Sequence, residues 1–112
     1  MTPGELEYAT KLVRNIISRG HFISVFDGEG YAVKCSRDGD RILSEMAATD
    51  MDSLIIHSSA NNAVIGRMRL IYGNDPEGSE LIADHTDNAL CNAIWNEVMG
   101  GNARDDQLEW EF

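Results

Sequence analysis

The chain has 112 residues, with 19 Asp and Glu against 9 Lys and Arg, and a formal net charge of −10. A net charge of this sign repels nucleic acid and anionic membranes and attracts basic protein surfaces, which argues against direct nucleic-acid binding. The length suits one domain that buries a core without metal or disulfide staples. Because no apolar run approaches the roughly 18 residues of a membrane span and no signal-peptide pattern begins the chain, the sequence predicts a cytoplasmic protein without membrane contact.

The first predicted element is a helix that begins after Thr2 and ends at Gly20. Thr2 is a capping residue, Pro3 suits the first helical position, and Glu5 stands three residues after the cap. Apolar residues then recur at helical spacing, at Leu6, Ala9, Val13 and Ile16.

A β-hairpin and a short helix are expected next. Residues 21–26 and 31–35 are aromatic and β-branched runs separated by a short loop with two glycines, which is typical of a hairpin. The helix that follows is capped by Ser36 or Asp38 and ends near Thr49.

Three more strands are predicted, at residues 53–57, 63–72 and 80–84. In the second of them, apolar residues alternate with Arg67 and Arg69. Because strand side chains alternate between the two faces of a sheet, one face of this strand enters the core and the other carries both arginines into solvent or onto a partner.

The last helix is expected to begin around Thr86 or Asp87 and to end at the glycine pair after Met99. The order α-β-β-α-β-β-β-α indicates an α+β domain, an antiparallel sheet of four to five strands with three helices on one face. The domain should span residues 1–101, and residues 102–112 are either an acidic tail or an added edge strand.

The two cysteines, Cys35 and Cys91, have no Cys-x-x-Cys spacing that would suit zinc or redox chemistry. A free cysteine behaves as a small hydrophobic residue. We therefore expect both thiols to be buried and reduced.

Residues 84–88, Asp-His-Thr-Asp-Asn, are the best candidate for a metal or acid/base site, and His57 would join them only through the fold. Their place at a strand-to-helix junction favours helix capping instead. The loop at 36–40 lacks the ligand pattern of a calcium loop, and no phosphate-binding or serine-hydrolase motif is present. We predict no catalytic residues, no metal and no cofactor, with a small enzyme or ligand binder around His57 and His85 as an alternative.

The C-terminal residues 107–112, Gln-Leu-Glu-Trp-Glu-Phe, alternate large apolar residues with acids. Such a segment either packs on its own sheet or adds to the sheet edge of a partner, with Leu108, Trp110 and Phe112 in pockets. It resembles the short extended peptides by which bacterial proteins dock on the sliding clamp of DNA polymerase, although Trp110 stands where an aliphatic residue is usual. That resemblance implies a replication-linked adaptor as a second alternative.

Three segments of the chain, at residues 23–34, 70–75 and 84–88, resemble small uncharacterised proteins of bacteriophages and prophages. The resemblance covers about residues 20–95 and supplies no catalytic residues. It implies a protein of the bacterial host cytoplasm. Small acidic phage proteins often occupy the nucleic-acid site of a host protein, as several anti-CRISPR and restriction-inhibiting proteins do.

The leading hypothesis is therefore a phage-derived acidic protein that binds a basic host protein surface, including one that normally holds nucleic acid. The contacts are expected from carboxylates in turns, because turns display them without disturbing the core. These carboxylates are Asp27, Glu29, Asp38, Asp40, Asp75 and Glu77. The hypothesis requires that they gather into one patch.

Overall fold

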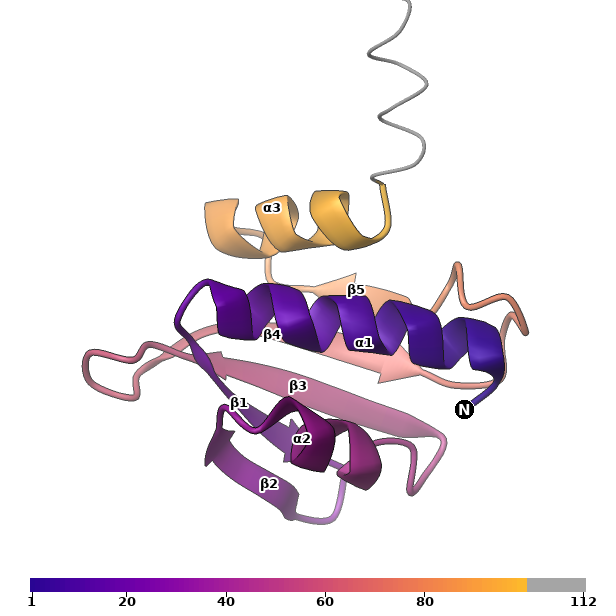
Figure 1. Cartoon of the computed structure of the whole chain (residues 1–112), viewed down its shortest axis with the longest axis horizontal. Coiled ribbons are helices and arrows are strands. Elements are labelled where there is room, and N and C mark those ends of the chain that lie inside the picture. The colour runs from indigo at the N-terminus through magenta and orange to yellow at the C-terminus, as the bar shows by residue number, and fades with distance from the viewer. Residues whose placement is uncertain (101–112) are drawn as a thin grey trace, which may run out of the picture.

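The helices and strands follow the predicted order in the computed structural model, which describes residues 1–100 (Figure 1). The elements are α1 (Pro3–Ser18), β1 (Phe22–Phe26), β2 (Tyr31–Ser36), α2 (Gly39–Glu45), β3 (Met51–His57), β4 (Val64–Ile71), β5 (Ile82–His85) and α3 (Ala89–Val98). The α+β class and the three-helix, five-strand composition are confirmed.

The five strands form one antiparallel sheet in the order β2-β1-β3-β4-β5. All three helices of residues 1–100 pack on the same face of this sheet, with α1 between α2 and α3, and no helix among these residues lies on the opposite face (Figure 1). The core lies between the helices and the sheet. Its fully buried side chains include Leu12, Val13, Ile16, Ile23, Val25, Ile42, Leu54, Ile56, Met68, Leu70 and Ile94.

The N-terminus of α1 is fixed as the sequence predicts. The Thr2 side chain accepts a hydrogen bond from the Glu5 N–H at 3.1 Å, and Glu5 Oε1 accepts one from the Thr2 N–H at 2.9 Å, which completes a capping box. Glu5 is only 2% exposed, and its Oε2 also accepts from the Gly73 N–H at 2.7 Å. Thr2 Oγ1 donates to the Pro76 carbonyl at 2.6 Å. The start of α1 is therefore joined to the loop between β4 and β5.

Two helix boundaries differ from the prediction for local reasons. α2 ends at Glu45 and not near Thr49, because Ala47 adopts a φ of 64° and its N–H donates to the buried carboxylate of Asp52 at 2.7 Å. α3 begins at Ala89 and is capped by Asn88. It does not begin at Thr86 as predicted, because Thr86 is still hydrogen-bonded to Arg67 of β4.

The expectation of two buried thiols is wrong for Cys35 and confirmed for Cys91. β2 is an edge strand with an irregular register against β1, and Cys35 has a φ of 43° at this irregularity. The bulge turns the Cys35 side chain to the exposed surface.

Within residues 1–100, no helix has both the length and the apolar character that crossing a membrane requires.

Candidate functional site

Three loops meet at the end of the domain where α1 begins (Figure 1). They are residues 27–30 between β1 and β2, residues 46–50 between α2 and β3, and residues 72–81 between β4 and β5. One hydrogen bond and one polar contact link these loops to one another. The Tyr72 N–H donates to the Asp50 carbonyl at 2.9 Å. The Thr49 hydroxyl donates to the Met51 carbonyl at 2.8 Å and lies 3.4 Å from the Asp27 carbonyl.

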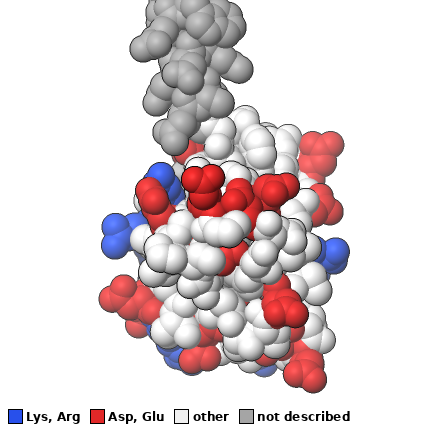
Figure 2. Space-filling model, turned by 90° about the vertical axis from the view of Figure 1, so that its right-hand side faces the viewer, with Lys and Arg blue, Asp and Glu red and all other residues white. Residues whose placement is uncertain are grey.

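The carboxylates of these three loops form a set that we call the acidic end. Its members are Asp27, Glu29, Asp50, Asp75, Glu77 and Glu80. The three loops contain no Lys or Arg. Figure 2 looks onto this end of the molecule and shows carboxylates spread across it, with Lys and Arg at the margins. Because screening acts over about 8 Å at physiological salt, neighbouring carboxylates here reinforce one negative potential.

Two members of the acidic end hold their own loops in shape. The Asp27 carboxylate accepts from the backbone N–H groups of Glu29 and Gly30, at 2.9 and 3.0 Å. These hydrogen bonds lower the pKa of Asp27. Asp75 accepts from the Ser79 hydroxyl and the Glu77 N–H, which likewise lowers the pKa of Asp75. Both carboxylates are thus kept ionised by hydrogen bonds that favour the charged form.

The other four members leave their carboxylates free for a partner. Glu29, Asp50, Glu77 and Glu80 are exposed. Within residues 1–100, no side-chain hydrogen bond or ion pair engages any of these four carboxylates. A cationic partner would therefore meet them without first breaking an internal contact.

The structure brings together four of the six turn carboxylates predicted from sequence and separates the other two. Asp38 is the N-cap of α2, where it accepts from the Arg41 N–H at 3.2 Å, and Asp40 lies in the first turn of that helix. Both follow the C-terminal end of β2, which is the end far from the 27–30 turn (Figure 1). Asp50 and Glu80 were not predicted. The sequence pattern assigned Glu80 to a strand at 80–84, whereas β5 begins at Ile82, and Asp50 directly follows the helix that was expected to end near Thr49.

The three C-terminal residues of the adaptor hypothesis, Leu108, Trp110 and Phe112, lie outside the described residues.

The two histidines of the enzyme alternative lie on opposite faces of the sheet. His57 is on the open face, where its ring nitrogens contact Ser24 Oγ at 2.8 Å and the Asn62 carbonyl at 3.0 Å. His85 pairs with the buried Met68 and stacks near Trp95 of α3, with ring centroids 6.1 Å apart. They cannot line one pocket. Among residues 1–100, no group of three His, Cys, Asp or Glu is arranged to hold a metal ion.

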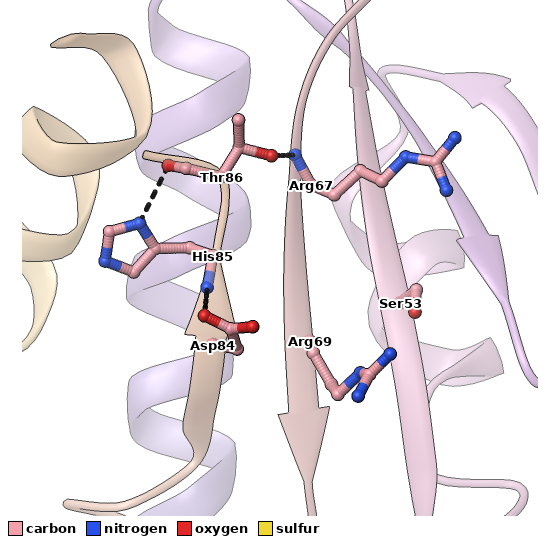
Figure 3. Close-up of a pocket in the computed structure, with 6 residues that line it drawn as sticks. All are labelled: Ser53, Arg67, Arg69, Asp84, His85 and Thr86. Carbon is pink, nitrogen blue, oxygen red and sulfur yellow. Dashed lines mark hydrogen bonds between the residues drawn. The ribbon is translucent and has the colours of Figure 1, made fainter. Parts of the chain in front are cut away.

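A second candidate site lies on the open face of the sheet. It is a hollow of about 250 Å³ that we call the arginine hollow, lined by Ser53, Arg67, Arg69, Asp84, His85 and Thr86 (Figure 3). The ring of His85 points away from the two arginines, toward α3. Ser53, Arg69 and Asp84 are successive cross-strand partners on β3, β4 and β5, so their side chains emerge side by side on this face. The predicted alternation in β4 is confirmed, since Met68 and Leu70 are fully buried and both arginines are exposed.

Comparison with known proteins identifies no relative. No protein-family model, no curated protein and no solved structure matches this chain. The resemblance to small phage proteins therefore stays a prediction.

Proposed function

We propose that this is a binding protein whose acidic end docks on a basic protein surface. The observation that carries the proposal is the meeting of three cation-free loops at one end of the domain. The Tyr72–Asp50 hydrogen bond joins two of them, and Asp27 and Asp75 accept hydrogen bonds from the backbones of their own loops. These bonds fix the loop backbones in the free protein. A preorganised patch loses less conformational entropy on binding than a flexible one.

The chemistry of the acidic end favours a partner rich in Arg or Lys. Its carboxylates accept hydrogen bonds and donate none when ionised, so they match the fixed donor fork of a guanidinium or the three donors of an ammonium. Like charges held close together on a surface oppose folding, and an opposing cationic surface relieves that repulsion. A partner surface that normally holds the phosphates of nucleic acid has this character. The resemblance to phage proteins adds the proposal that the partner belongs to the host cell.

The test compares two variants with the same net charge. E29Q/E77Q removes two exposed carboxylates of the acidic end, and D40N/D87N removes two exposed carboxylates elsewhere. Immobilised wild-type protein and both variants are incubated with bacterial lysate at low and high salt, and a recovered partner is purified so that its Kd can be measured. Each exposed ion pair contributes about 0.2–1 kcal/mol. We expect E29Q/E77Q to weaken binding by about 2- to 30-fold and D40N/D87N to leave it unchanged.

Competition with DNA or RNA for the partner then tests whether the acidic end occupies a nucleic-acid site. Equal loss of binding in both variants would show that net charge, and not this patch, drives association. Binding that does not change with salt would contradict an electrostatic interface outright.

A further inference from the structure

The arginine hollow places two unpaired cations side by side in a strongly acidic chain. Arg67 and Arg69 are two residues apart on β4, so their backbones are separated by about 7 Å and both side chains leave the same face. Figure 3 shows both guanidinium groups extending over β3, on the side away from β5. Within residues 1–100, no hydrogen bond or ion pair engages either guanidinium, although Asp84 is the cross-strand partner of Arg69.

The hollow also offers a hydroxyl group beside the two cations. Ser53 lies next to Arg69 across the strand pair. Thr86 Oγ1 is already engaged, because it accepts from the Arg67 N–H at 3.0 Å and its side chain hydrogen-bonds the Cys91 thiol. Two guanidinium forks and the Ser53 hydroxyl provide more donors than the two oxygens of a carboxylate can use. A phosphate group presents three or more acceptor oxygens and is the anion that arginine forks bind in bidentate fashion.

Asp84 gives the hollow a second and different recognition group. Its Oδ1 accepts from the adjacent His85 N–H at 2.9 Å. No hydrogen bond from residues 1–100 reaches its Oδ2, so this oxygen can accept from a ligand. A carboxylate at the edge of a phosphate site repels a second anionic group and accepts from a hydroxyl. The hollow is therefore suited to a ligand with one phosphate and neighbouring hydroxyl groups.

We propose that the arginine hollow binds a phosphate monoester of a hydroxyl-bearing small molecule, such as a sugar phosphate or a nucleoside monophosphate. Arg67 and Arg69 hold the phosphate, Ser53 donates to one of its oxygens, and Asp84 accepts from a ligand hydroxyl. The size of the hollow, about 250 Å³, suits this group and not a polymer. The net charge of −10 repels a nucleic acid more strongly than a single monoester, because repulsion grows with the charge of the ligand.

A row of aromatic side chains separates the two classes of monoester. Phe26 is the cross-strand partner of Ser53, and its ring meets that of Tyr31 edge to face with centroids 5.4 Å apart. A nucleobase over this pair would draw the ribose toward β1 and away from Asp84 on β5, so a nucleotide contacts either the aromatic pair or Asp84, and a sugar phosphate contacts Asp84. Tighter binding of the nucleotide would therefore assign the ligand to the nucleotide class, and equal binding would assign it to the sugar phosphates.

The experiment follows backbone amide shifts of the full chain by NMR during titration with ribose 5-phosphate and with adenosine 5′-monophosphate. Ribose and adenosine serve as phosphate-free controls. We expect saturable shifts at Ser53, Arg67, Arg69 and Asp84 with a Kd on the order of 1 mM, as suits a shallow site with two cations. R67Q/R69Q should weaken binding about tenfold or more, while R14Q/R41Q, which removes two exposed cations from the helices, should leave it unchanged.

R67K/R69K keeps both charges and removes the bidentate forks, so its affinity should fall between those of the wild-type protein and R67Q/R69Q. Undisturbed amide shifts of the core in each variant show that the fold is intact. Three results would overturn the proposal: no saturable shift on the open face, equal loss of binding in R14Q/R41Q, or tighter binding of a single-stranded oligonucleotide than of the monophosphate.

Discussion

Gly66 allows α3 to pack directly on β4, and replacing it with alanine tests this contact. A Cβ at position 66 would lie closer than 3.0 Å to Cys91 Sγ and 3.6 Å from Ile56 Cδ1. Non-bonded heavy atoms are stable at about 3.5–4.0 Å, so the Cβ and the sulfur would overlap while the second contact is ordinary. α3 cannot withdraw freely, because Asn88 at its N-terminus donates to the Ile65 carbonyl at 3.0 Å.

G66A should therefore destabilise the protein by about 1–3 kcal/mol, the usual cost of overpacking a core. The matched control is G30A, because a Cβ at Gly30 would have no neighbour within 4 Å and the residue does not need a positive φ. At such an open position, alanine is expected to be neutral or to stabilise by up to about 1 kcal/mol. Urea denaturation followed by far-UV circular dichroism measures both changes.

A double-mutant cycle with C91A identifies the atom responsible. C91A alone removes a fully buried sulfur and should cost about 1 kcal/mol. In G66A/C91A, the new methyl group of residue 66 enters the space left by Sγ. The loss of unfolding free energy in the double variant should therefore be smaller than the sum of the two single losses by about 1–2 kcal/mol. Additive effects within about 0.5 kcal/mol would refute the contact between Gly66 and Cys91 as the cause.

Three further substitutions test the acidic end and its supports. E5Q removes a carboxylate whose pKa is raised by burial but lowered more by hydrogen bonds from the backbone of Gly73 and Thr2, so that it lies below the ordinary value of a glutamate. The substitution should cost about 2 kcal/mol at pH 7. The charged Glu5 side chain stabilises the fold at pH values above its pKa in the unfolded chain, and this stabilisation is lost as the pH falls through its lower pKa in the folded protein. In E5Q, the unfolding free energy should therefore fall less steeply as the pH is lowered through the acid range. G78A should cost more than about 2 kcal/mol of stability, because the new Cβ would lie 2.6 Å from the Gly4 carbonyl oxygen and because residue 78 has a φ of 88°. A thermal melting curve measures the loss. Y72F removes the hydroxyl that donates to buried Asp52 at 2.6 Å and should cost about 1–3 kcal/mol in urea denaturation.

The elements that sequence predicted correctly depend on contacts within a few residues. The capping box of α1 involves Thr2 and Glu5 alone, and the alternation in β4 requires only the pleat of one strand. The errors come from contacts between one element and the next. α2 stops early because the Ala47 N–H donates to Asp52, five residues ahead in β3, and Cys35 is exposed because β2 pairs irregularly with β1. Neither partner could be identified from the local pattern.

The arginine hollow was predicted only in part. Alternation in β4 places Arg67 and Arg69 together on the face away from the core, and that much follows from the sequence. Ser53 and Asp84 join them through the registers of β3 and β5 against β4, which include an irregularity between Arg69 and Leu70. A shift of one residue in either register would turn these side chains to the other face. The site therefore required the structure.

The acidic end follows from a regularity of antiparallel topology. Successive elements run in opposite directions, so every second connection falls at the same end of the domain. The connections at 27–30, 46–50 and 72–81 alternate with those at 37–38 and 58–63, and this alternation gathers one set of carboxylates and separates Asp38 from it. The cations of β4 lie within a strand and so open onto the sheet face. Because connections and strand faces are separate surfaces, E29Q/E77Q should leave phosphate binding intact, and R67Q/R69Q should leave partner binding intact.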